Sequence, residues 1–223
     1  MTDGPEHHVD RRTYLKGAAL ISAAVSVPDA TFAQSQAGAS PMSDNLTADE
    51  IISLLKLEPN ATCGFVRVTF RSALSVAPGG LPAPFADGQP LGSALYFLVT
   101  PDAPVRLHRI RNDQLYHYYL GDPLEVFLLH AQGHTERIVV GPDLRGGHCV
   151  QLLIPGNTFH TARLLGRGRW FLGGSTEWPG VVPADVEIGN LDELARAYPA
   201  VAADLRAIAT SVQNVAPSAA GPR

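Results

Sequence analysis

The chain has 223 residues, of which 45% are hydrophobic and 17% charged, and this suits one globular domain with terminal extensions. The formal net charge is −4 and no basic stripe is present, which argues against a nucleic acid partner. Eighteen prolines and 21 glycines favour short strands and frequent turns over a helical bundle.

The N-terminal segment has the features of an export signal. Arg11 and Arg12 precede a short Ala-rich apolar run at residues 17–27, and small residues that suit a signal peptidase follow. This order resembles a twin-arginine signal and predicts a signal peptide over 1–33, a linker over 34–46 and a periplasmic or secreted protein. The alternative is a tail with a chance arginine pair. The apolar run is too short for a helix that crosses a bilayer, so no stable membrane span is expected.

The next segments predict one helix and then many strands. Thr47 and Glu50 form a capping-box pattern that predicts a helix from about 47 to 56. Alternating residues predict a strand at Phe65–Arg71, before a Pro/Gly-rich loop at 78–90. Further β-prone segments, separated by turn residues, are expected at 93–100, 107–110, 114–120, 125–130, 136–140, 150–155, 159–165 and 169–175. No helical pattern separates them, so the fold class is all-β with short peripheral helices, a sandwich or barrel.

The C-terminal part returns to helical patterns. Asn190 is a candidate N-cap, Pro199 interrupts the helix, and residues 201–208 continue it. The folded domain is expected over 47–210, with a disordered tail over 211–223. Cys63 and Cys149 fit neither a zinc knuckle nor any CxxC motif, and two buried free thiols are favoured over one disulfide.

A hairpin at 107–121 carries the most informative spacing. His108 is followed by Ile110, Gln114 and Gly121, and the order H-x-I-x3-Q-x6-G resembles the first cupin motif, G-x5-H-x-H-x3,4-E-x6-G. The segment from Pro155 to His160 resembles the second motif, P-x-G-x2-H. His108 and His160 therefore fall where two metal ligands of a cupin would fall.

One branch of small single-domain cupins of poorly defined function is more similar still. Its pattern H-R-x-x-x-D-E-x-W-H-x-Y-x-G-D-P-L matches a series of residues in the hairpin: His108, Arg109, Asp113, His117, Tyr119, Gly121, Asp122, Pro123 and Leu124. Two acidic residues of that branch are replaced here by Gln114 and Thr62, and its tryptophan is Tyr116. The lost carboxylates weaken the case for acid–base chemistry. The resemblance implies a jelly-roll barrel, the double-stranded β-helix of cupins, and a homodimer.

Strand periodicity assigns side chains to the barrel interior. If His108 faces inward, the alternation along the hairpin turns Gln114, Tyr116 and Tyr118 inward and His117 outward. The expected pocket also contains residues from other strands, with an arginine at its mouth: Tyr96 or Phe97, Gln151, His160, and Arg67 or Arg71.

The sequence leaves two interpretations of this pocket open, and it identifies no catalytic residue. In the first, His108, His160 and Gln114 hold one divalent metal (Zn, Fe, Mn or Ni), and the chain is an isomerase, lyase or dioxygenase acting on a small polar or aromatic acid. In the second, the histidines only form hydrogen bonds, and the chain binds a sugar-like or aromatic small molecule without catalysis.

Overall fold

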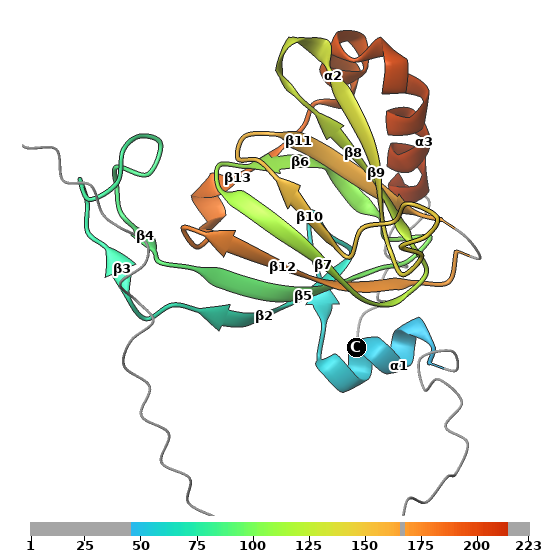
Figure 1. Cartoon of the computed structure of the whole chain (residues 1–223), viewed down its shortest axis with the longest axis horizontal. Coiled ribbons are helices and arrows are strands. Elements are labelled where there is room, and N and C mark those ends of the chain that lie inside the picture. The colour runs from blue at the N-terminus through green and yellow to red at the C-terminus, as the bar shows by residue number, and fades with distance from the viewer. Residues whose placement is uncertain (1–45, 166–167, 214–223) are drawn as a thin grey trace, which may run out of the picture. The chain divides into compact units, whose positions relative to one another are not determined.

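The computed structural model describes residues 46–165 and 168–213. Its strands form two large sheets that face each other, as the ribbon in Figure 1 shows. The expected signal peptide and the linker up to residue 45 lie outside the described residues. The described helices include none that is long and apolar enough to cross a membrane.

The first large sheet has six strands and contains the second arm of the predicted hairpin. Every neighbouring pair in it is antiparallel. In spatial order the strands are β1 (Glu58–Pro59), β2 (Phe65–Arg71), β5 (Ser93–Val99), β12 (Phe171–Trp178), β7 (Asp113–Gly121) and β10 (Gln151–Ile154).

The second large sheet has five strands and contains the first arm of the hairpin, so the turn at Arg111-Asn112 joins the two sheets. In spatial order the strands are β13 (Val186–Ile188), β6 (Val105–Ile110), β11 (Phe159–Leu164), β8 (Leu124–Leu129) and β9 (Thr135–Val140). A short third sheet pairs β3 (Ser75–Val76) with β4 (Gln89–Pro90). This two-sheet, jelly-roll-like sandwich confirms the predicted fold class.

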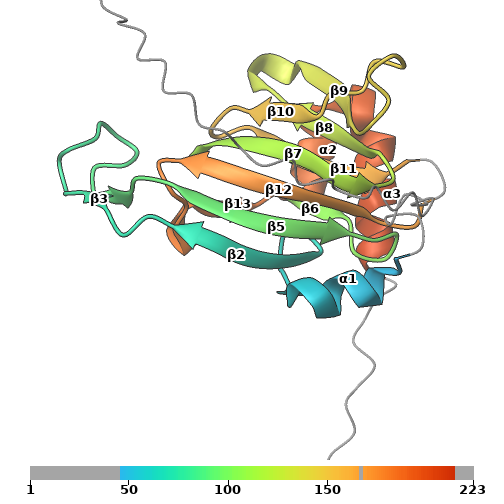
Figure 2. The same ribbon diagram turned by 60° about the horizontal axis from the view of Figure 1, so that its bottom comes forward.

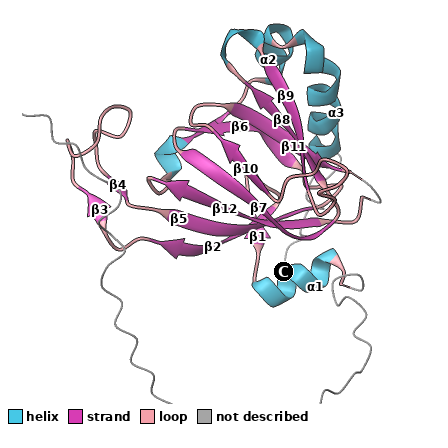
Figure 3. Cartoon of the chain, in the orientation of Figure 1, coloured by secondary structure: helices cyan, strands magenta, loops and turns pink. Residues whose placement is uncertain are grey.

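Helices cover the outer faces of the two large sheets, which Figures 2 and 3 show from two sides. Helix α1 (Ala48–Leu55) begins at the predicted capping box and packs on the first sheet through Ile51. Helices α2 (Leu191–Ala197) and α3 (Ala202–Gln213) pack on the second sheet. Helix α3 continues to Gln213, so the predicted boundary between domain and tail at residue 211 was placed too early.

The core has three layers, and strand alternation decides which layer each side chain enters. Between the sheets lie residues of both inner faces, among them Phe97, Tyr116 and Val126. Phe127 packs instead under α3, and Leu98 packs under α1. Strand β8 is buried on both faces for this reason. Cys63 and Cys149 are free thiols, and each is half-buried.

Candidate functional site

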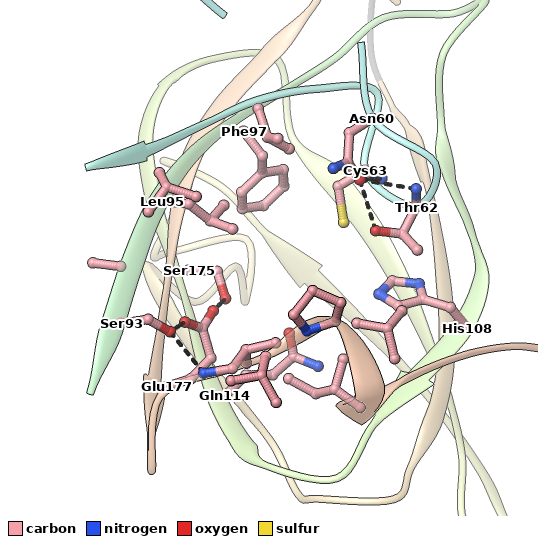
Figure 4. Close-up of a pocket in the computed structure, with 18 of the residues that line it drawn as sticks. Asn60, Thr62, Cys63, Ser93, Leu95, Phe97, His108, Gln114, Ser175 and Glu177 are labelled. Atoms are coloured by element: carbon pink, nitrogen blue, oxygen red, sulfur yellow. Dashed lines mark hydrogen bonds between the residues drawn. The ribbon is translucent and has the colours of Figure 1, made fainter. Parts of the chain in front are cut away.

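A cavity of about 210 Å³ lies between the inner faces of the two sheets. Figure 4 shows its labelled residues pointing toward a common space from several strands. Its walls are largely apolar, with a small number of polar groups. The aliphatic and aromatic part of the lining is Val66, Val68, Ala94, Leu95, Phe97, Ile110, Val181, Val182, Pro183 and Val186.

His108 and His160 are brought together by the register of the second sheet. They are direct partners on β6 and β11, so both side chains leave the sheet on the same inner face. Their ring centroids are 4.2 Å apart. His108 lines the cavity, whereas His160 is completely buried and does not line it. The expectation that both rings point inward and lie close together is confirmed.

Hydrogen bonds fix the state of both imidazoles. Nδ1 of His108 lies 2.7 Å from the carbonyl oxygen of Arg106, and Nδ1 of His160 lies 3.3 Å from that of Thr158. Each Nδ1 must carry the proton and donate it, because a carbonyl only accepts. Nε2 of His160 then accepts from the hydroxyl of Tyr116 at 3.1 Å.

Burial keeps both histidines uncharged. It lowers the pKa of His108 to about 4. The pKa of His160 is also lowered well below its ordinary value, first by burial and second by the neighbouring His108. At neutral pH the cavity therefore presents Nε2 of a neutral His108, which accepts no hydrogen bond from any of the described residues.

A row of four polar side chains crosses the inner face of the first sheet. Arg71 pairs with Ser93 in the strand register, Ser93 with Glu177, and Glu177 with Gln114. Because direct partners on neighbouring strands share a face, all four point into the barrel. Each of them lines the cavity. Arg71, at one end of the row, is the last residue of β2.

Glu177 is the carboxyl group of this row, and two serines hold it. The hydroxyl groups of Ser93 and Ser175 donate to its two oxygens, each at 2.5 Å. The backbone N–H of Val181 donates to the oxygen of Ser93, which directs the serine proton toward the carboxylate. Burial raises the pKa of Glu177, although both serine hydrogen bonds act in the opposite direction. In Figure 4 Glu177 and His108 lie on opposite sides of the cavity.

Comparison with known proteins gives the family. Residues 49–189 match the family described as Cupin superfamily (DUF985). The chain belongs to the cupin superfamily. Two solved structures are similar to this cupin over 73% of its chain at 24% sequence identity: a hypothetical protein from Leishmania major (TM-score 0.66, 98% of that chain) and a protein from Shewanella oneidensis (TM-score 0.65, 97% of that chain). No curated protein matches the sequence.

Several of the residues assigned to a face of the hairpin or to the pocket mouth lie on the expected face, but not all of them line the cavity. Gln114, Tyr116 and Arg71 line the cavity as expected. Tyr118 packs in the core between the sheets, and its hydroxyl donates to the carbonyl of Gly121, but it does not line the cavity. His117 points outward as expected and bonds to Thr176.

Three residues named for the pocket do not line the cavity, and strand registers give the reason: Phe97 and Arg71 take the places of Tyr96 and Arg67, and Gln151 faces outward. Tyr96 lies on the outer face, where it packs under α1, and Phe97 takes the inner position. Gln151 pairs with the outward His117 and bonds to its ring, so it too faces outward. Arg67 is exposed, and its guanidinium donates to the carbonyl of Leu55 at the end of α1.

The predicted metal site has two of its three residues in contact, but its donors do not fit a metal ion as they stand. His108, His160 and Gln114 are all uncharged, and the lone pair of His160 Nε2 is engaged by Tyr116. No group of three or more His, Cys, Asp or Glu side chains in the described part of the chain is arranged to hold a metal. Each histidine instead forms hydrogen bonds with its own neighbours, His108 with Arg106 and His160 with Thr158 and Tyr116, as in the second of the two interpretations.

Glu177, Ser93 and Ser175 were not among the site residues predicted from the sequence. The strand expected at 169–175 in fact runs from Phe171 to Trp178, which left Glu177 outside any predicted strand. A signal was present, since Ser175 and Glu177 alternate with Thr176 and therefore share a face. That signal could not identify the inner face without a partner strand.

Proposed function

We propose that this cupin binds a small molecule in the barrel cavity and catalyses proton transfer on it, as an isomerase or a lyase does. The single observation that carries the proposal is Glu177. It is a buried carboxyl group in the wall of a largely apolar cavity, opposite a neutral imidazole. A carboxylate whose pKa is raised by burial is a stronger base than an exposed one, and such groups concentrate at catalytic sites.

The two sides of the cavity have complementary roles in this proposal. Glu177 is the group that takes up and returns the proton, and the two serines hold its oxygens in place. His108 is too weak a base for that task, because its pKa is about 4. Its free Nε2 accepts a hydrogen bond from an O–H or N–H of the substrate and so orients the molecule. No step of this proposal runs through a metal ion.

Hydrogen exchange at carbon tests the proposal. Lactate, mandelate, pyruvate and phenylpyruvate are incubated with the full chain in D2O, and loss of each C–H signal is followed by NMR. We expect exchange above the buffer rate with at least one of these acids. Glu177→Gln should abolish it by removing the base while keeping the shape. Glu187→Gln is the matched control, because Glu187 is exposed and pairs with Arg109 away from the cavity.

The competing function is binding without catalysis, which the apolar lining favours. Binding of these acids without exchange would support this second function and overturn the first. Exchange that survives in Glu177→Gln would overturn the assignment of Glu177 as the group that moves the proton. The proposal covers the mature protein, which we propose is exported through its Arg11-Arg12 signal and forms a homodimer. Light scattering on purified protein measures the second of these directly.

A further inference from the structure

Arg71 is a charged side chain at the cavity that has no partner in the described part of the chain. It is the last residue of β2, it is exposed, and it lines the cavity. Its guanidinium forms no hydrogen bond or ion pair with any residue that the structure describes. Since an arginine carries five N–H donors and a permanent charge, this is an unused binding group.

A β-bulge explains why Arg71 reaches the cavity and Arg67 does not. Residues four apart in a regular strand share a face, so Arg67 and Arg71 would point the same way. The pairing of β2 with β5 shifts between Val68 and Phe70, and the extra residue reverses the alternation. Val68 and Arg71 consequently both line the cavity, while Arg67 lies on the other face and bonds to α1.

The charges of the lining leave Arg71 unmatched. Burial keeps the thiol of Cys63 and the hydroxyl of Tyr116 protonated by raising the pKa of each. His108 is neutral, and Glu177 lies two strands away with Ser93 between them, where no ion pair joins it to Arg71. The lining therefore offers one permanent positive charge at its exposed end, next to apolar walls.

We propose that the cavity takes a monocarboxylate, and that Arg71 binds its carboxylate group. A guanidinium matches a carboxylate with two parallel N–H donors, which no other cavity residue provides. The size of the cavity limits the rest of the molecule. A cavity of roughly 150 Å³ holds benzene, so about 210 Å³ accommodates a body the size of one aromatic ring or a short branched chain.

This assignment deepens the proposed function and rests on the same cavity. A carboxylate held at Arg71 lies at one end of the polar row, and the carbon atoms next to it extend along that row toward Glu177. Removing a proton from a carbon next to a carboxylate places a second negative charge beside the first. An arginine that neutralises the carboxylate therefore assists the removal of that proton.

Binding of benzoate, with benzamide as its uncharged counterpart, tests the inference by calorimetry or ligand-observed NMR on the full chain. We expect benzoate to bind and benzamide to bind on the order of tenfold more weakly. Arg71→Gln should weaken benzoate by on the order of tenfold and leave benzamide unchanged. Arg67→Gln removes the same charge from the same strand, and it should leave benzoate binding intact. The difference in affinity between benzoate and benzamide should become smaller as salt is added.

Several results would overturn the inference: equal binding of benzoate and benzamide, equal loss in the two arginine variants, or no binding of benzoate. Circular dichroism and thermal melts of Arg71→Gln and Arg67→Gln show that both remain folded. Failure of the inference is distinct from failure of the proposed function. Binding that depends on Arg71, without hydrogen exchange in D2O, would support the carboxylate site and contradict the proton transfer. Exchange that is unaffected in Arg71→Gln would support the proton transfer and contradict the carboxylate site.

Discussion

Replacing Tyr116 with phenylalanine tests the hydrogen-bonded state of the two histidines. The ring packs at 4.8 Å from that of Phe97, and phenylalanine keeps this contact. The hydroxyl is lost, and with it the donor to Nε2 of His160, a side chain with no exposed surface. A buried acceptor left without its donor costs about 1–3 kcal/mol. We therefore expect Tyr116→Phe to lower the free energy of unfolding by about 2 kcal/mol, and the Tm by about 4–8 °C.

The measurement is urea denaturation and calorimetry of wild type and variant at pH 7. Tyr119→Phe is the matched control, because Tyr119 lies three residues further along the same strand and is 43% exposed. That change should alter stability by less than about 0.5 kcal/mol. Equal stability of Tyr116→Phe and wild type would refute the assignment of the Tyr116 hydroxyl as donor. It would also reopen the question of whether Nε2 of His160 is available to a metal.

The other expectations concern pH, the α3 contact, metal and export. Burial lowers the pKa of His108 to about 4 from 6.5, so the unfolded chain binds more protons than the folded chain between these pH values. The free energy of unfolding should therefore fall by about 3 kcal/mol as pH drops from 6.5 to 4. Urea titrations measure this, and a His108→Gln variant whose free energy of unfolding falls equally steeply with pH would contradict it. Arg163 pairs with the buried Glu125 and with Asp204 of α3, so Arg163→Gln should cost about 2 kcal/mol and speed amide exchange in α3, and unchanged exchange there would refute the contact. Protein purified without a His tag should hold zinc at well below one equivalent by elemental analysis, whereas one full equivalent lost in His108→Ala would restore the metal interpretation. Mass spectrometry of protein from the native host should find a mature start between about residues 34 and 40, and an intact Met1 would disprove export.

The sequence was sufficient for the fold because its signals are local. The Thr47–Glu50 capping box, the alternating Phe65–Arg71 segment and the regular turn residues each predict an element that the structure contains. The hairpin spacing was sufficient to bring His108 and His160 together, since the motif resemblance fixes which strands are neighbours. Element ends were less certain, as the early end of the expected strand at residue 175 shows.

The inner and outer faces could not be assigned where they depend on another strand. Alternation states which residues of one strand share a face, but only the register states which face is inside. Gln151 was placed inward because nothing in its own segment contradicts that choice, yet its partner is His117. The bulge in β2 has no clear signal in the sequence either, and it alone decides between Arg67 and Arg71.

The replacement of a carboxylate by Gln114 takes on a different meaning once the register is known. Gln114 and Glu177 are direct partners on β7 and β12, and both side chains are buried in the same wall. An acidic residue at 114 would put two carboxyl groups side by side, and one of them would have to stay protonated. With glutamine there, the wall holds one carboxyl group beside a neutral amide. The loss that weakened the case for acid–base chemistry in the sequence thus leaves Glu177 as a single ionisable carboxyl group in this wall, free of a competing neighbour.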